Sequence, residues 1–431
     1  MLNLFFILLA ASIFYYFCRK NILWGIGLII IFLPSYLWRF SIGSLPSTFL
    51  EMMLLILFFV WALRYGPYQK FFWQEIHIEK KWLLVSAVWL VASCVAWLVN
   101  PNFRSLGIWR AYFLEPVLFF LVLLHTIQKE HDYKLIIKSL TILIFWLSIF
   151  AIVQNFTAIN LPAAYDYPNV KRLTSVFSYP NALSLLTAAF SGFLVAYYFF
   201  KQRQWEYLVI GVLGIFLSWW AVSQGALTGL LCALLLVALI KMYGRLQNKR
   251  QKKIFLGFFI ALFLFLASTP MARGLYQEIF HPVFDLQASS LEIRSSQWQE
   301  TWQMLKHDWF LGVGLNAYQA KLIPYHRVLW LEIFLYPHNI FLNFWVEMGL
   351  FGLSVFLLIM YFVSRELQGL FLHKNKLAWP LLVLWVVWFV HGLVDVPYFK
   401  NDLSLLFFIF LILTIKAKKI DDNLQSKQIL V

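Results

Sequence analysis

The sequence predicts an all-α protein, a polytopic bundle of transmembrane helices. Its 431 residues are 62% hydrophobic and 13% charged, whereas a soluble domain is about half apolar and about a quarter charged. Apolar runs of about 17 to 24 residues, each long enough to cross a hydrocarbon layer of about 30 Å as a helix, follow one another along the chain. We therefore expect about 12 to 13 spans in one integral membrane domain, residues 1–431.

The first apolar run, MLNLFFILLAASIFYYFCRK, is followed by basic residues and is not preceded by them. Because a cleaved signal peptide begins with a basic region, we interpret this run as an uncleaved helix whose N-terminus lies outside the cytoplasm. Cys18, Cys94 and Cys232 all fall inside predicted spans without paired spacing. Neither a disulfide framework nor a zinc site is therefore expected.

The net charge of +15 comes mostly from short connectors between the apolar runs. This distribution indicates cytoplasmic loops and no nucleic-acid partner. The basic C-terminal tail, residues 415–431, is expected in the cytoplasm, and alternation of the spans then places every strongly basic connector on the same side. These connectors are Arg64–Lys81, Gln128–Lys134, Lys201–Glu206, Lys241–Lys253 and Arg365–Lys376.

Two connectors on the opposite side are much longer than neighbouring helices require. The smaller covers residues 159–181, and the larger covers residues 271–337, between the tenth and eleventh expected spans. We expect the functional residues there. In the larger loop, apolar residues recur near helical spacing and predict an amphipathic helix resting at the membrane surface. They are Ile293, Trp298, Trp302, Leu305 and Trp309.

His338 stands where the larger loop returns to the membrane, in the stretch YPHNIFLNFWVEMGLFGL. Histidine accepts a proton near neutral pH, as a general base must, and Pro337 with Asn339 would fix the turn into the next helix. The alternative is an interfacial histidine that only caps this helix. Both interpretations are open at this point.

Glu347 lies about two turns into the same membrane helix, where an ionisable group is costly unless it is paired. We expect a cation or a cluster of donors as its partner. A buried ion pair or a hydrogen bond to loop backbone is favoured over direct chemistry. Gly349 and Gly352 lie one turn apart and predict close contact with another helix. The nearby GVGLNAY, from Gly312, lacks the features of a phosphate loop and predicts a turn.

Several arginines fall on or near the extracytoplasmic side. The guanidinium of Arg294, in the larger loop, suits a diphosphate, although arginines on amphipathic helices also contact lipid headgroups. Lys171 and Arg172 close the smaller loop against the positive-inside pattern, which favours an anionic substrate there. Arg110 and Glu115 form an intramembrane cation and anion whose i,i+5 spacing predicts separate partners.

In pattern and order, the chain resembles the O-antigen ligase and polymerase superfamily of bacterial membrane proteins. The resemblance covers about the C-terminal two thirds. Its motifs are KRLTSVFSYPNALS, the polar break AVSQGAL, Arg294 followed by WFLGVG, PHNIFLNFWVEMGLFGL, and FVHGLVDVPYF with His391 and Asp395.

The resemblance implies transfer of a glycan from an undecaprenyl-diphosphate carrier to a hydroxyl of a glycan, lipid or protein acceptor. The reaction would occur at the extracytoplasmic face of the bacterial inner membrane, in lipopolysaccharide or other cell-surface polysaccharide biosynthesis, with no nucleotide sugar, cofactor or required metal. It further implies that His338 is the general base and that Arg294 binds the diphosphate.

One departure affects the donor site. Many relatives have Ser-Arg-Gly where this chain has Ser223, Gln224 and Gly225. Either Arg172 or Arg110 then supplies the missing charge, or the donor is held differently. Asn181 and Gln224 complete the candidate substrate-binding residues. Asn181 is also expected, with Pro180, to form the turn and cap of the next helix.

Two other classes of protein also fit many helices with intramembrane charges. A transporter or flippase of lipid-linked oligosaccharide would be expected to show inverted repeats and paired broken helices, and the sequence shows neither. A membrane scaffold would leave Glu347 and Arg110 unexplained. Within the enzyme interpretation, ligase and polymerase share one donor chemistry and are not separated by the sequence.

Overall fold

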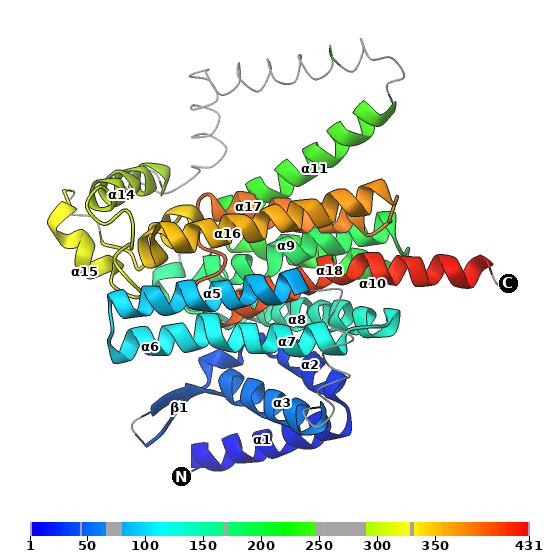
Figure 1. Cartoon of the computed structure of the whole chain (residues 1–431), viewed down its shortest axis with the longest axis horizontal. Helices are drawn as coiled ribbons and strands as arrows, with labels where there is room; N and C mark the ends of the chain where they lie inside the picture. The colour runs from blue at the N-terminus through cyan, green and yellow to red at the C-terminus, as the bar shows by residue number, and fades with distance from the viewer. Residues whose placement is uncertain are drawn as a thin grey trace.

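The computed structural model describes residues 2–43, 45–65, 80–166, 171–245, 253, 290–327 and 332–429. Its helices lie side by side as one bundle (Figure 1), and the predicted all-α polytopic fold is confirmed. The first elements are α1 (Leu2–Lys20), α2 (Ile22–Ile31), the 3₁₀ turn η1 (Leu33–Leu37), the antiparallel strands β1 (Arg39–Ile42) and β2 (Leu45–Thr48), and α3 (Phe49–Tyr65).

The middle of the chain forms α5 (Lys80–Val99), α6 (Phe103–Trp109), the π-helix η4 (Arg110–Leu114), α7 (Glu115–Thr126), α8 (Glu130–Thr157), η5 (Ala163–Tyr165), α9 (Pro180–Phe200), α10 (Trp205–Trp220) and α11 (Gln224–Arg245). The last described elements are α14 (Ser290–Leu305), α15 (Tyr318–Leu322), η6 (Ile323–Tyr325), α16 (Ile340–Leu372), α17 (Ala378–Gly392) and α18 (Asn401–Ile429).

Six of the described helices are long and apolar enough to cross a membrane, by length and composition alone. They are α5, α6 continued through α7, α8, α9, α11 and α16, and the shorter apolar helices are α2, α10 and α17. On α5, Leu84, Val91 and Leu98 are each more than half exposed at seven-residue intervals. One side of that helix is therefore an apolar stripe suited to lipid. Residues 254–289 lie outside the described part, so the count of 12 to 13 spans stays a prediction.

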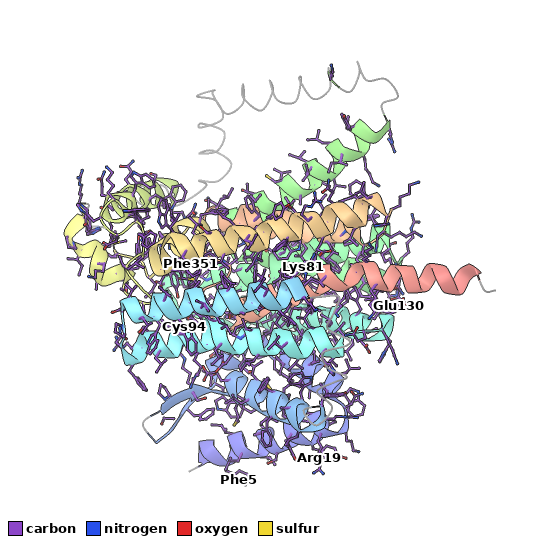
Figure 2. The ribbon with its side chains drawn as sticks, viewed as in Figure 1. Phe5, Arg19, Lys81, Cys94, Glu130 and Phe351 are labelled. Carbon is purple, nitrogen blue, oxygen red and sulfur yellow. The ribbon has the colours of Figure 1, made fainter. Side chains whose placement is uncertain are left out.

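The bundle has two distinct ends (Figure 1). We call the end that carries α14, α15 and the β1–β2 hairpin the loop end, and the end that carries the C-terminus the tail end. Figure 2 shows Lys81 and Glu130 toward the tail end, while Cys94 and Phe351 lie nearer the loop end. Two of the predicted cytoplasmic connectors thus meet the bundle at one end. Which end faces the cytoplasm stays a prediction.

The centre of the bundle is α18, whose residues from Leu405 to Leu413 are buried without interruption. The helix does not end at Thr414, where the polar tail was expected to begin, but continues to Ile429. The tail sequence KAKKIDDNLQSKQ contains no glycine or proline to stop it,. Lys416 remains tied to the bundle because its Nζ donates to the Leu124 carbonyl at 2.9 Å.

A break in α16 receives part of the larger loop. Gly349 has a φ of 65°, and the loop backbone joins the helix there through Val313 N to Val346 O at 2.7 Å and Leu350 N to Phe310 O at 2.9 Å. A Cβ at position 349 would collide with the Phe310 carbonyl oxygen. The absence of a side chain at Gly349 is thus required by the close approach of the loop backbone. The spacing of the two glycines had predicted close contact with a neighbouring helix, and that prediction is wrong for Gly349.

The other glycine predictions have mixed outcomes. A Cβ on Gly352 would meet the Met348 side chain of its own helix, so this residue also gives no support for close helix contact. GVGLNAY does form the predicted turn, with φ of 69° at Gly312 and 86° at Gly314. Both values favour glycine.

Candidate functional site

His338 occupies a strained position at the loop end of α16. Its φ is 47°, in the left-handed region that residues with side chains rarely adopt,. The chain is fixed on both sides of it: Trp298 donates its indole N–H to the Pro337 carbonyl at 2.7 Å, and the Asn339 side chain caps α16 by accepting from Phe341 N at 3.0 Å. Because Asn339 is the cap, the interpretation of His338 as a helix cap is wrong.

Asp395, between α17 and α18, faces the His338 ring. His338 Nδ1 lies 3.3 Å from Asp395 Oδ1, and the other carboxylate oxygen accepts from Asn181 Nδ2 at 3.1 Å. The Val396 N–H also donates to Oδ1, at 2.9 Å. A carboxylate only accepts hydrogen bonds, so the contact assigns a proton to Nδ1 and leaves Nε2 as the basic nitrogen.

Charges around Asp395 keep it ionised. Burial raises the pKa of the Asp395 carboxyl, but the hydrogen bond with His338 and neighbouring positive charges, including Arg294, outweigh burial. The resulting pKa lies well below its usual range,. Asp395 is therefore an anion at neutral pH and holds the His338 ring electrostatically. It was noticed in the sequence only as part of a motif, without this role.

The helix α14 presents a polar face to the protein. Gln297, Glu300 and Thr301 are buried, the Thr301 hydroxyl lies 2.7 Å from the Tyr318 hydroxyl, and Glu300 accepts from Arg327 N at 2.8 Å. The predicted helix is confirmed, but this docking was not expected from its apolar periodicity. That α14 rests at the membrane surface stays a prediction.

Docking of α14 brings Arg294 to the site. This residue stands one turn before Trp298, which contacts the residue preceding His338. Its positive charge lowers the pKa of Asp395. Arg294 and His338, which lie 44 positions apart in the chain, thus belong to one electrostatic cluster.

The smaller loop is held against the polar break between α10 and α11. Arg172 donates from Nε at 3.3 Å and Nη2 at 3.2 Å to the Ala221 carbonyl, two residues before Ser223. The Gln154 carboxamide holds the same loop by accepting from Thr174 N at 2.8 Å. The arginine side chain thereby reaches the polar break that contains Ser223 and Gln224.

The polar break itself packs against α17. Gln224 begins α11, and a Cβ on the next residue, Gly225, would lie 2.7 Å from the His391 ring. Asn181 was expected to cap α9, but Tyr179 occupies the cap position and Asn181 is the second residue of the helix. The Asn181 side-chain amide contacts Asp395. Pro180 is the first residue of α9, where its missing N–H has no cost.

Arg110 lies in a separate cluster, which corrects its predicted separation from Glu115. The guanidinium is 2.6 Å from Glu51 and its Nε is 3.2 Å from Glu115 Oε1. The π-helix from Arg110 to Leu114 explains the pairing, because its wider turn brings residues five apart onto one face,. Two carboxylates thus already contact this cation.

Glu347 has a structural partner. Its carboxylate accepts from the Asn316 backbone N–H at 2.8 Å, where Asn316 has a φ of 62°. The predicted hydrogen bond to loop backbone is present, and the contact at Glu347 comes from a main-chain donor, not a cation. This bond helps fix the loop against α16 beside Gly349.

Lys400 is a cation that sequence reasoning missed. Its ammonium lies 4.7 Å from the Phe177 ring and 5.1 Å from both the Tyr36 and Tyr179 rings. Burial lowers its pKa, while the carboxylates of Asp402 and Asp395 act against that effect. The only sequence signal was the position of this lysine, five residues after Asp395.

The described part of the chain contains no group of three or more His, Cys, Asp or Glu side chains arranged to hold a metal ion. A family model described as O-Antigen ligase matches residues 207–357, a range that includes Gln224, Arg294 and His338. A search of curated proteins finds no match. The match supports the resemblance over residues 207–357, which contain the polar break, the Arg294 motif and the His338 motif.

Proposed function

We propose that this chain transfers a glycan from an undecaprenyl-diphosphate carrier to an acceptor hydroxyl, because residues 207–357 match a family model described as O-Antigen ligase. At family level it is a membrane glycosyltransferase of the O-antigen ligase or polymerase type. The single observation that carries the proposal is the His338–Asp395 contact at 3.3 Å. A base oriented by a carboxylate is what hydroxyl activation requires.

In the proposed reaction, His338 Nε2 accepts the proton of the acceptor hydroxyl. The hydroxyl oxygen forms a bond to the anomeric carbon as the bond from that carbon to the diphosphate oxygen breaks. The negative charge then resides on the departing undecaprenyl diphosphate. A direct displacement of this kind inverts the anomeric centre.

The departing diphosphate needs positive charge close to the reacting carbon. We assign this role to Arg294, with Arg172 and Lys400 in support. Arg172 reaches the break at Ala221, and Lys400 lies close enough to Asp395 for their charges to interact. Arg110 is less suited, because Glu51 and Glu115 already contact it. The three cations would replace the arginine absent from position 224.

The proposed location is the bacterial inner membrane, with the loop end on the extracytoplasmic face. Lys81 and Glu130, which mark where the basic connectors Arg64–Lys81 and Gln128–Lys134 meet the bundle, lie toward the tail end. Through the positive-inside rule, the Lys and Arg residues of these connectors support this orientation. Impermeant thiol reagents should label a cysteine introduced at Lys321 on α15 in intact cells. Labelling only after lysis would contradict the orientation.

Purified protein in lipid nanodiscs tests the activity. With an undecaprenyl-diphosphate-linked glycan and a hydroxyl acceptor, the wild type should form the glycosidic product and release undecaprenyl diphosphate in equal amounts. A flippase would instead move a fluorescent lipid-linked oligosaccharide across vesicles without releasing diphosphate. Movement without product would overturn the transferase proposal.

A further inference from the structure

A cavity of about 840 Å³ lies at the loop end, beside the His338 site but with different walls. It is bounded by the β1–β2 hairpin, the start of α3, the α6–η4 segment and α15. Its volume falls in the range of about 300–1,000 Å³ that is typical of small-molecule sites. The proposed mechanism does not use the residues that line it.

The cavity lining carries an excess of positive charge. Arg39, Arg104 and Arg110 line it together with one carboxylate, Glu51. Arg110 is paired with Glu51, whereas Arg39 and Arg104 form no ion pair with any residue that the structure describes. Two guanidinium groups are therefore available to bind an anionic group as a bidentate fork.

Although most of the lining is apolar, some of its groups are partners for a saccharide. The partly exposed Trp109 ring offers a flat face for a sugar ring, and the amide side chains of Asn316 and Asn401 offer hydrogen bonds to hydroxyls,. A lipid phosphate would use the same arginines but would not require the amide groups.

The cavity shares two segments with the catalytic site. Leu335 lines it and precedes His338 by three residues, while Asn401 lines it and directly follows Lys400. The Tyr36 ring, a wall of the cavity, lies 5.1 Å from the Lys400 ammonium. A saccharide held in the cavity would therefore lie against the two segments that carry Lys400 and the proposed base.

We propose that this cavity binds the acceptor and selects an acidic saccharide, one that carries a carboxylate or phosphate read by Arg39 and Arg104. The assignment as acceptor site rests on the proposed transferase function. Binding of an acidic saccharide does not, because it needs no reaction. The two can therefore fail separately.

The test measures binding of trigalacturonate, an acidic probe, and galactotriose, its neutral counterpart, to protein in phosphatidylcholine nanodiscs. We expect trigalacturonate to bind the wild type and to lose about 10- to 100-fold in affinity in the Arg39→Gln/Arg104→Gln variant, as expected for charged hydrogen bonds. Arg365→Gln, on the far half of α16, is the matched control and should bind as the wild type does. His338→Ala should also bind normally.

Three results would overturn the proposal. The first is no binding of trigalacturonate to the wild type, and the second is equal affinity in the wild type and the double arginine variant. The third is competition by phosphatidylglycerol in nanodiscs that contain it. If trigalacturonate no longer binds there, and the wild type but not the double arginine variant retains phosphatidylglycerol, the cavity is a site for a lipid headgroup. Normal binding by His338→Ala in the absence of any transfer by the wild type would contradict only the transferase function.

Discussion

His338 Nδ1 lies 3.3 Å from Asp395 Oδ1, although 57 positions separate the two residues in the chain. The contact joins the start of α16 to the segment between α17 and α18. A strained backbone at His338 and a second carboxylate bond from Asn181 fix its geometry. We interpret this pair as the base and the anion that orients it.

Asp395→Asn should lower transfer by about 10²- to 10⁴-fold while leaving donor binding nearly intact, because the neutral amide no longer fixes the His338 tautomer. Steady-state transfer and donor-binding measurements separate the two effects. Asn181→Ala, which removes one bond to the same carboxylate, should cost much less. Equal losses in both variants would reduce Asp395 to a packing role.

The depressed pKa of Asp395 sets the direction of the pH dependence. A carboxylate with a lowered folded pKa contributes stability above the ordinary pKa of about 3.9, and this contribution is lost only as pH falls through the lower folded value. Asp395 should stay ionised from pH 5 to 8. Its titration should therefore contribute no limb to the transfer profile in this range, which a measurement of transfer per folded molecule against pH checks.

Arg294→Lys should lose much of the transfer activity and Arg294→Ala more, because an ammonium does not reproduce the bidentate fork of a guanidinium. Lys306→Ala, which removes an exposed cation just beyond the same helix, is the control and should transfer normally. Thermal unfolding in detergent checks that all three fold. Normal transfer by Arg294→Ala would make this arginine a headgroup contact.

Lys400 should make donor binding sensitive to high pH. Because burial lowers its pKa, the ammonium loses its proton at a lower pH than an ordinary lysine, and affinity for undecaprenyl diphosphate should fall as pH rises. In Lys400→Arg, the guanidinium should take the place of the ammonium among the Tyr36, Phe177 and Tyr179 rings. This variant should bind the donor and lose affinity only at a higher pH. Lys400→Met should bind weakly at every pH. An unchanged dissociation constant in Lys400→Met would remove Lys400 from the donor site.

Glu347→Gln should retain both folding and transfer, because the amide oxygen still accepts from Asn316 N. Glu347→Leu should destabilise the protein by about 1–3 kcal/mol, since that N–H loses its partner. Thermal unfolding and transfer per folded molecule are the two measurements. A folded Glu347→Gln protein without transfer would show that the carboxylate acts in the chemistry.

The sequence predicted the membrane bundle, the candidate sites at His338 and Arg294, and a structural partner for Glu347, because hydropathy, motifs and the cost of a buried charge are local signals. It could not place Asp395 beside His338, since that contact depends on how α17 and α18 return to the loop end. The π-helix at Arg110 was missed for a related reason: ideal α-helical spacing was assumed.

Gly349 shows how a correct residue can be given the wrong partner. Glycines one turn apart usually indicate close helix packing, but the backbone of Phe310 approaches position 349 instead. Only the fold of residues 310–313 against α16 reveals this. Lys400 gave no signal beyond its position five residues after Asp395, because its three aromatic neighbours come from distant parts of the chain.

The central claim is that His338 takes the proton of the acceptor hydroxyl, and the most direct test is transfer by purified His338→Asn protein with lipid-linked donor and acceptor. Asparagine tolerates the left-handed backbone at this position but is no effective base at neutral pH. We expect transfer to fall by about 10²- to 10⁴-fold, as in His338→Ala, with donor binding nearly intact. A His338→Asn protein that transfers glycan at the wild-type rate would contradict the account.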